Sequence, residues 1–210
     1  MLAVLIGLGT WQMRRRAWKR ALLAEIAVAE AAPGVPLAPG VAPFTHVTIT
    51  GTLRPDHVLY GAEVRDGPRG QVLGAQLIEV LDAASGPNPG RPVLVDRGWV
   101  DTASVPPTPA APVTVDGFVR PPERAGLLSA TDDPAARRFW TLDPTKIAVA
   151  LGVAVPPFTV VALGPASLPD PARGIPRPPD NHLNYALTWF SFAAILMIIF
   201  VLYARKALRR

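Results

Sequence analysis

The sequence predicts a membrane protein of the α+β class, in which two transmembrane helices flank an antiparallel β-rich extramembrane domain, barrel- or sandwich-like, with one short helix. Three observations support this prediction. One apolar run near the C-terminus is long enough to cross a bilayer, a shorter one opens the chain, and short runs of alternating apolar and polar residues lie between them. The length of 210 residues leaves room for one ordinary domain besides the membrane segments.

The C-terminal apolar run extends from Leu183 to Tyr203 and contains no charged residue. As an α-helix it would cover about 30 Å, which is the thickness of a hydrocarbon core. We therefore predict a transmembrane helix at 180–204, followed by a basic cytoplasmic tail at 205–210. The flanking signals are Pro178 and Pro179 as helix breakers, Asp180 or Asn181 as the cap, and Arg205 and Lys206 after the run.

The first apolar run covers residues 1–11 and is too short to cross a bilayer by itself. Its basic residues follow the run and no small-residue cleavage site comes after it, which argues against a signal peptide. The segment continues as an amphipathic helix to about Ala32, where Pro33 and Gly34 end it. We predict that 1–32 is a transmembrane helix that is truncated in this chain or spans poorly. Basic residues follow both apolar runs in similar number, so charge alone leaves the topology open.

The region 33–179 is predicted to be a β-rich domain. A tight turn at 65–70 joins two of its strands as a hairpin, and a helix is expected at 144–151, capped by Asp143 and ended by Gly152. The predicted strands are 44–53, 57–64, 71–80, 92–100, 113–119, 138–142 and 157–163.

A weak internal repeat relates two of these strands. The sequence VTITGTLRP at 47–55 and the sequence VTVDGFVRP at 113–121 share Val, Thr, a β-branched residue, Gly, an aliphatic residue, Arg and Pro in register. We interpret them as pseudo-symmetric strands of one sheet, with a chance match as the alternative.

The composition argues against several classes of function. The net charge of +5 comes with basic clusters beside the apolar runs, which lipid headgroups attract, and no basic stripe suited to nucleic acid occurs between them. The chain has no cysteine and only three methionines, which argues against a Cu(I) site with sulfur ligands. It also lacks the common nucleophile, nucleotide and metalloprotease motifs, so we do not expect an enzyme.

His182 is the strongest candidate for a binding residue. Tyr185 and Trp189 follow it at helical spacing, so all three side chains lie on one face at the start of the C-terminal helix. An imidazole nitrogen can be an axial ligand of haem iron, and aromatic faces can pack against a macrocycle. The alternative is an interfacial histidine with two aromatic belt residues. His46 and His57 are expected on polar faces of strands.

A second candidate is the end of the strand PVLVDRGWV. Asp96 and Arg97 form either a local ion pair or an interaction surface, Gly98 permits a bulge, and Trp99 packs beneath it.

Three segments, GTWQMRRRAWK at 9–19, LVDRGWV at 94–100 and NHLNYALTWF at 181–190, resemble motifs of the Surfeit locus protein 1 family, in order and spacing. These proteins are assembly factors for cytochrome c oxidase. The resemblance covers most of the chain. It departs from the family pattern at the short first apolar run and at Asp96, where the family often has Asn.

The resemblance implies two transmembrane helices in the bacterial inner membrane, or the mitochondrial inner membrane in a eukaryote, with the central domain on the periplasmic side. It implies a role in supplying haem a to oxidase subunit I, with His182 as the haem contact, Tyr185 and Trp189 as pocket walls, and haem a synthase as a further partner. The alternative is a scaffold that binds no haem. A partner surface is expected to include Trp11, Gln12, Arg15, Trp18, Arg97, Gly98 and Trp99.

Overall fold

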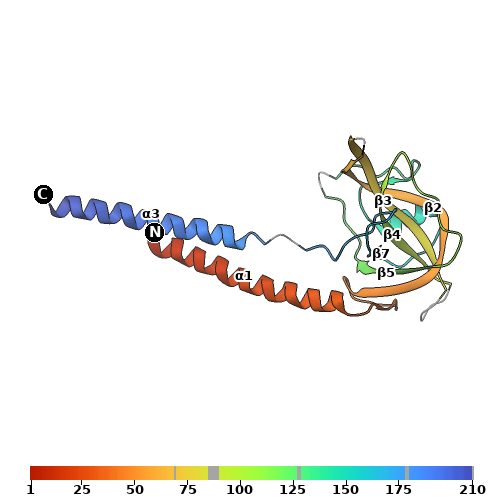
Figure 1. The fold of residues 1–210 in the computed structure, drawn as a ribbon, viewed down its shortest axis with the longest axis horizontal. Helices are drawn as coiled ribbons and strands as arrows, with labels where there is room; N and C mark the ends of the chain where they lie inside the picture. The colour runs from red at the N-terminus through yellow and green to blue at the C-terminus, as the bar shows by residue number, and fades with distance from the viewer. Residues whose placement is uncertain (69, 85–89, 127–128, 178–179, 210) are drawn as a thin grey trace. The chain divides into compact units, whose positions relative to one another are not determined.

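The computed structural model of the chain describes all residues except 69, 85–89, 127–128, 178–179 and 210 (Figure 1). The described residues form two compact units. The helical unit consists of Met1–Ala29 and Pro176–Arg210, and the β-rich unit consists of Glu30–Ile175. The helix-breaking role expected of Pro178 and Pro179 lies outside the described residues.

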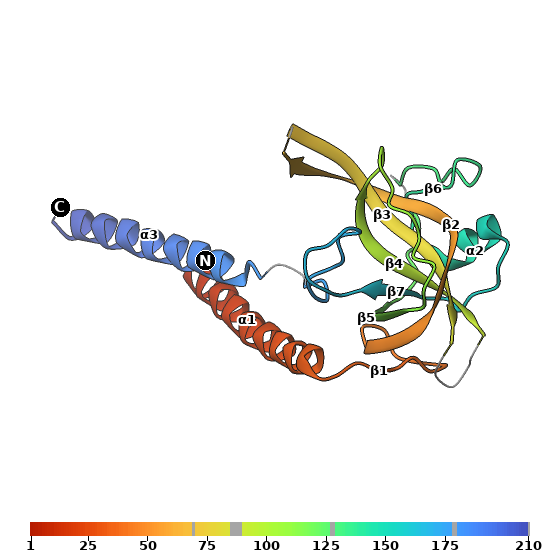
Figure 2. The ribbon, with the colours of Figure 1, turned by 45° about the vertical axis from the view of Figure 1, so that its right-hand side comes forward.

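The helical unit is built from two long helices. Helix α1 covers Leu2–Ala31 and helix α3 covers His182–Leu208, so α3 continues through the basic residues that we expected to form a separate tail. The first part of α3 runs beside the first part of α1 in the opposite direction (Figures 1 and 2). Asn181 occupies the N-cap position of α3 but its side chain makes no capping bond, whereas the Asp180 carboxylate, one residue earlier, accepts a hydrogen bond from the His182 N–H at 3.2 Å.

Helix α3 is the one helix in the described part of the chain that is long and apolar enough to cross a membrane. Its apolar side chains between Ile195 and Tyr203 are mostly exposed, as expected of a surface that faces lipid. Helix α1 has 30 residues, but five basic residues interrupt its apolar character between Arg14 and Arg20. That α1 also spans a membrane stays a prediction.

The β-rich unit contains one mixed sheet and one short helix. The helix α2, Pro144–Leu151, begins and ends as predicted: Asp143 accepts the Thr145 N–H at 3.0 Å, and Gly152 ends it with a left-handed conformation. The strands are β1 (Val35–Pro36), β2 (His46–Gly67), β3 (Gly70–Ala83), β4 (Pro92–Asp101), β5 (Val113–Arg120), β6 (Arg138–Phe139) and β7 (Thr159–Ala162).

The expectation of a purely antiparallel sheet is wrong. Three pairings, β1 with β2, β2 with β6 and β4 with β7, are parallel. The pairings run from β2 through β3, β4, β7 and β5 and return to β2, so these five strands form a ring. Parallel neighbours arise because the long connection after β5, which contains β6 and α2, brings β7 back beside β4.

Strand β2 replaces two predicted strands. The runs 44–53 and 57–64 form one strand, and register shifts after Leu53 and Tyr60 mark the irregular points between them. Pro55 suggested a break, but a bulge accommodates the irregular segment without ending the strand. The predicted hairpin is confirmed, although Gly67 pairs with Gly70, so the chain reverses just after the Asp-Gly pair.

The remaining differences concern short strands. The run 138–142 provides only the two residues of β6, because the backbone N–H groups of Trp140 and Thr141 bond the Asp132 carboxylate instead of a strand. The run 157–163 shortens to β7, and β1 was not predicted because two residues in a proline-rich segment give no periodic signal.

The internal repeat has a simple structural meaning. Its two copies pair with each other, since the first part of β2 lies antiparallel to β5. Ile49 pairs with Val115, its own equivalent in the repeat, while Thr48 pairs with Asp116 and Thr50 pairs with Thr114. A local two-fold axis therefore passes through the Ile49–Val115 pair.

The two larger of three apolar clusters in the described part of the β-rich unit hold its elements together. One lies among the five ring strands and includes Ile49, Leu81, Val95 and Val160. The other includes Val58, Phe139, Leu142 and Ile147, and joins α2 to the outside of the sheet beside β2 (Figure 2). At roughly 1.5–3 kcal/mol for each large apolar side chain, this burial is the main stabilising contribution to the unit.

Candidate cofactor and partner sites

The helical unit has a close contact between α1 and α3. Gly9 is buried, and a Cβ atom at that position would lie 2.5 Å from the ring of Phe190, so a larger residue would separate the helices there. Ala186 and Ala193 are the buried residues of α3. Small residues at such positions let two helices approach closely.

His182 is held at this contact by a side chain from α1. Its Nδ1 lies 2.7 Å from Oε1 of Gln12, and both side chains are half-buried. An amide oxygen accepts hydrogen bonds and cannot donate them, so Nδ1 carries the proton. In the neutral tautomer that this bond favours, the lone pair is on Nε2, which has no hydrogen-bond partner among the described residues. Metal-ligating histidines have the same arrangement, with one ring N–H donated to an oxygen and the other nitrogen free.

The other two residues of the predicted haem site lie on the same helix. Tyr185 is exposed over 56% of its surface, while Trp189 is half-buried and packs edge-on against Phe192, with ring centroids 6.2 Å apart. The structure thus places His182 at the contact between α1 and α3. On the following turns of α3, Tyr185 is exposed and Trp189 is half-buried.

The α1 residues of the expected partner surface divide into two kinds. Trp11 and Trp18 are exposed by 55% and 53%, and the Arg15 guanidinium lies 4.0 Å from the centroid of the Trp18 ring. Exposed tryptophans are typical of membrane interfaces and of protein-binding surfaces. Gln12 differs from them because it faces His182, a role that the spacing of residues within α1 does not indicate.

The Asp96–Trp99 segment contains the bulge that was predicted. Gln76 pairs with Trp99 and Ile78 pairs with Asp96, so β4 has one extra residue relative to β3. Gly98 has φ +115°, and a Cβ atom there would lie 2.2 Å from the carbonyl oxygen of Asp170. Only glycine fits this conformation in this space.

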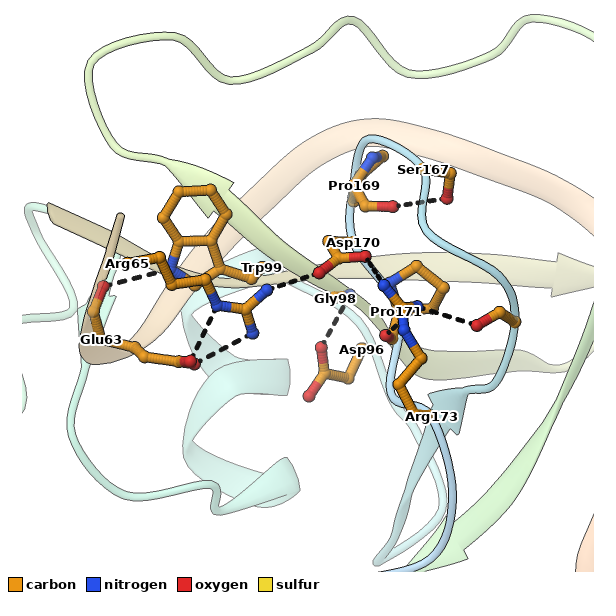
Figure 3. Close-up of polar contacts among 11 residues, drawn as sticks. Glu63, Arg65, Asp96, Gly98, Trp99, Ser167, Pro169, Asp170, Pro171 and Arg173 are labelled. Carbon is orange, nitrogen blue, oxygen red and sulfur yellow. Dashed lines mark hydrogen bonds and ion pairs between the residues drawn. The ribbon is translucent and has the colours of Figure 1, made fainter. Parts of the chain in front are cut away.

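The loop that covers the bulge is bonded to it at several points. The backbone N–H and C=O of Trp99 exchange hydrogen bonds with those of Asp170, each 2.9 Å long. Arg65 lies beside the Trp99 ring, donates to Glu63 at 2.7 Å and to Asp170 at 2.5 Å, and thereby joins the β2–β3 hairpin to this loop (Figure 3). Sequence reasoning missed Asp170, because a residue in a proline-rich loop gives no periodic signal.

Arg97 forms no local ion pair with Asp96. Its guanidinium instead bonds Glu79 on β3 at 2.7 Å, and Thr108 donates a further hydrogen bond to the same carboxylate at 2.5 Å. The Glu79 side chain is only 1% exposed and the Arg97 side chain 15%. The guanidinium therefore neutralises a buried carboxylate, which is a structural role; that Arg97, Gly98 and Trp99 also meet a partner stays a prediction.

Asp96 is a buried acid with a perturbed pKa. Burial raises the pKa to about 6, although a hydrogen bond from the Gly98 N–H at 3.0 Å and the charge of Arg120 act in the opposite direction. Burial thus disfavours the charged form of this carboxyl group and brings its protonation close to neutral pH. An asparagine at this position would keep the accepting oxygen and carry no charge.

His46 of β2 joins Ala32 to Asp116 of β5 within the β-rich unit. Its Nδ1 lies 2.8 Å from the carbonyl oxygen of Ala32 and its Nε2 lies 2.9 Å from the carboxylate of Asp116. Both oxygens can only accept, so both ring nitrogens donate and the ring is an imidazolium. Burial lowers the pKa of His46, but the bond to Asp116, the bond to Ala32 and the nearby Glu30 charge outweigh this effect and raise it above 6.5.

This geometry predicts a pH-dependent contribution to stability. Because the folded pKa is raised, the contribution is fully present below pH 6.5 and is lost as the pH rises through the higher folded pKa. Histidine NMR of the full chain in detergent should give a His46 midpoint above 6.5, and Asp116→Asn should lower this midpoint. A His46 midpoint unchanged by Asp116→Asn would contradict the assignment.

The two units together define the class of protein as a β-rich domain with a candidate membrane-spanning helix. A β-rich domain lies between two terminal helices, one of which can cross a membrane by its length and composition. In the described ranges no group of three or more His, Cys, Asp or Glu side chains is placed to hold a metal ion.

The chain belongs to the SURF1 family, whose profile matches residues 1–194. A SURF1-like protein of Rickettsia conorii is 27% identical over 219 aligned positions, covering 97% of this chain and 88% of the relative. The cytochrome oxidase assembly protein SHY1 of Saccharomyces cerevisiae is 28% identical over 155 positions, covering 65% of this chain and 38% of that protein. Surfeit locus protein 1 of Arabidopsis thaliana is 29% identical over 114 positions, covering 47% and 31%. The predicted family is thereby confirmed.

Proposed function

We propose that this protein assists the assembly of cytochrome c oxidase by binding haem a and helping to insert it into subunit I. Membership of the SURF1 family supports the assembly role, as does the similarity to the yeast cytochrome oxidase assembly protein SHY1. The observation that supports the haem role is the geometry of His182, whose Nε2 is left with a lone pair by the bond from Nδ1 to Gln12.

The residues at the helix contact fit this cofactor. Haem a, when bound, supplies an iron that takes an imidazole nitrogen as an axial ligand. His182 offers Nε2 for that bond, Gln12 holds the ring in the required tautomer, and Trp189 and Tyr185 offer aromatic surface beside it. None of these roles changes a covalent bond, so the proposal requires binding and release without catalysis.

The proposed setting is a bacterial inner membrane, or the mitochondrial inner membrane in a eukaryote. Both terminal helices cross the bilayer in this proposal, and the β-rich unit lies on the periplasmic side. The partners are oxidase subunit I and haem a synthase, which the exposed tryptophans of α1 could contact. A helix contact at which haem a is held loosely would suit transfer between these two proteins.

The direct test compares haem a in two preparations. The wild-type protein and His182→Ala are purified in mild detergent from cells that make haem a, and bound haem is measured as the pyridine haemochrome. We expect His182→Ala to retain less than about a tenth of the wild-type haem a, because loss of the group that hydrogen-bonds a ligating histidine alone already costs about 10–100-fold in metal affinity. His57→Ala, which replaces a histidine of β2, is the matched control and should retain haem a.

Variants of Gln12 test the tautomer argument. Gln12→Leu removes the acceptor for the Nδ1 proton and should weaken haem a binding, whereas Gln12→Glu retains an accepting oxygen and should bind nearly as well. Equal haem a in wild type, His182→Ala and Gln12→Leu would remove the cofactor from this site. Co-purification of oxidase subunits with a wild-type preparation that shows no haem absorbance would instead support the scaffold function.

A further inference from the structure

The β-rich unit contains an apolar pocket that the proposed function does not use. Its volume is ≈ 510 Å³, which is within the range of small-molecule sites. The pocket lies at one end of the strand ring, between the end of β3, the start of β4, the end of β5 and the segment before β7. Ile49, Val93 and Val119 line it, and all three belong to the apolar cluster inside the ring.

The walls of this pocket offer few hydrogen-bonding groups. Proline has no backbone N–H, so each proline in the wall removes a donor that another residue would present. The lining also includes Phe158 and aliphatic side chains from the loop 37–43. The six prolines are Pro39, Pro43, Pro121, Pro122, Pro156 and Pro157. Such a surface gains free energy by covering apolar groups and would leave a polar ligand without partners.

One charged residue lines the pocket. Arg91 is exposed, and no hydrogen bond or ion pair of its guanidinium is found among the residues that the structure describes. Elsewhere in this unit most arginines are paired, including Arg54, Arg97 and Arg120. A guanidinium fork binds a carboxylate through two parallel hydrogen bonds. Arg91 therefore complements a ligand that is apolar along most of its length and carries one anionic group.

We propose that this pocket binds a long-chain carboxylate, with the apolar chain inside the ring end and the carboxylate on Arg91. An apolar pocket beside a guanidinium that has no partner among the described residues matches one apolar chain and one anionic group. The site lies wholly within the β-rich unit and does not depend on His182 or on haem a.

The test uses the full chain in nanodiscs of zwitterionic lipid, which avoids competition from detergent. A palmitic acid with a diazirine on its chain is photo-crosslinked and the labelled peptides are identified by mass spectrometry. We expect saturable labelling of the pocket-lining segments, competition by oleate, and little competition by oleyl alcohol. Arg91→Gln should weaken binding of the carboxylate probe about tenfold, as loss of one charge-assisted pair predicts.

Two further variants test whether the probe binds in this pocket. Ala38→Trp fills the pocket from its loop and should abolish labelling, while Arg137→Gln removes an arginine of an exposed ion pair outside the pocket and should leave it unchanged. Circular dichroism establishes that each variant is folded. Binding that is unaffected by both Arg91→Gln and Ala38→Trp would overturn the proposal. So would preferential labelling by a diazirine phosphatidylglycerol in the nanodisc, which would assign the site to a bilayer lipid.

Discussion

Replacing Arg97 with alanine is expected to lower the free energy of unfolding by about 3–5 kcal/mol, because it leaves the buried Glu79 carboxylate without its counter-charge. The carboxylate is 1% exposed, so water cannot replace the guanidinium, and only the Thr108 hydroxyl would still donate to it. Urea unfolding of the full chain in non-ionic detergent, followed by circular dichroism, measures the loss.

Two controls separate buried charge from general damage. Arg54 forms a comparable 2.7 Å pair with Asp82, but both side chains are about 40% exposed, so Arg54→Ala should cost about 1 kcal/mol or less. Adding Glu79→Gln to Arg97→Ala should recover part of the lost stability, because the buried charge is then absent. If Arg97→Ala costs no more than Arg54→Ala, Glu79 is better solvated than the structure shows.

Replacing Gly98 with alanine is expected to cost about 2–6 kcal/mol, of which about 1–3 is backbone strain and about 1–3 is steric displacement. The residue has φ +115°, and the new Cβ would meet the Asp170 carbonyl oxygen at 2.2 Å. That collision pushes the covering loop away and breaks its two backbone bonds to Trp99. Thermal unfolding should show the loss, and the loop after β7 should become more susceptible to proteolysis.

Gly61 provides the matched control for this variant. It also has a positive φ, at +66°, but nothing lies within 4 Å of the position that a Cβ would take. Gly61→Ala should therefore show the cost of strain alone, about 1 kcal/mol. A Gly98→Ala protein as stable as Gly61→Ala would mean that the loop containing Asp170 moves aside freely.

Local patterns predicted the parts of the fold that depend on neighbouring residues. Helix α2 has its cap at Asp143 and its end at Gly152, and the β2–β3 hairpin has its turn residues between two alternating runs. The parallel pairing of β4 with β7 was missed because it joins segments that are distant in sequence. The residue pattern of neither strand indicates whether its neighbour runs parallel or antiparallel. The continuous β2 was missed because Pro55 is usually a break, whereas here it lies in a bulge.

In the candidate sites, too, local patterns identified individual residues but not their partners from distant segments. His182 was identified because its aromatic neighbours repeat at helical spacing within one segment. Its partner Gln12 comes from the other end of the chain, and the partner of Arg97 comes from another strand, so no local pattern could assign them. Asp96 and Arg97 are adjacent in sequence, yet successive residues of a strand point to opposite faces, which explains why Arg97 pairs with Glu79.

The pairing of the two repeat copies has a consequence for how the chain folds. The β2–β3 hairpin closes over a few residues, whereas Gly51 of β2 must find Val113 of β5 before the ring is complete. Loop-closure entropy rises with the number of residues enclosed, and non-local strand pairing slows folding. During synthesis, the edge of β2 that pairs with β5 therefore stays unpaired until β5 has been synthesised. The pairing of the two repeat copies therefore completes the ring of strands.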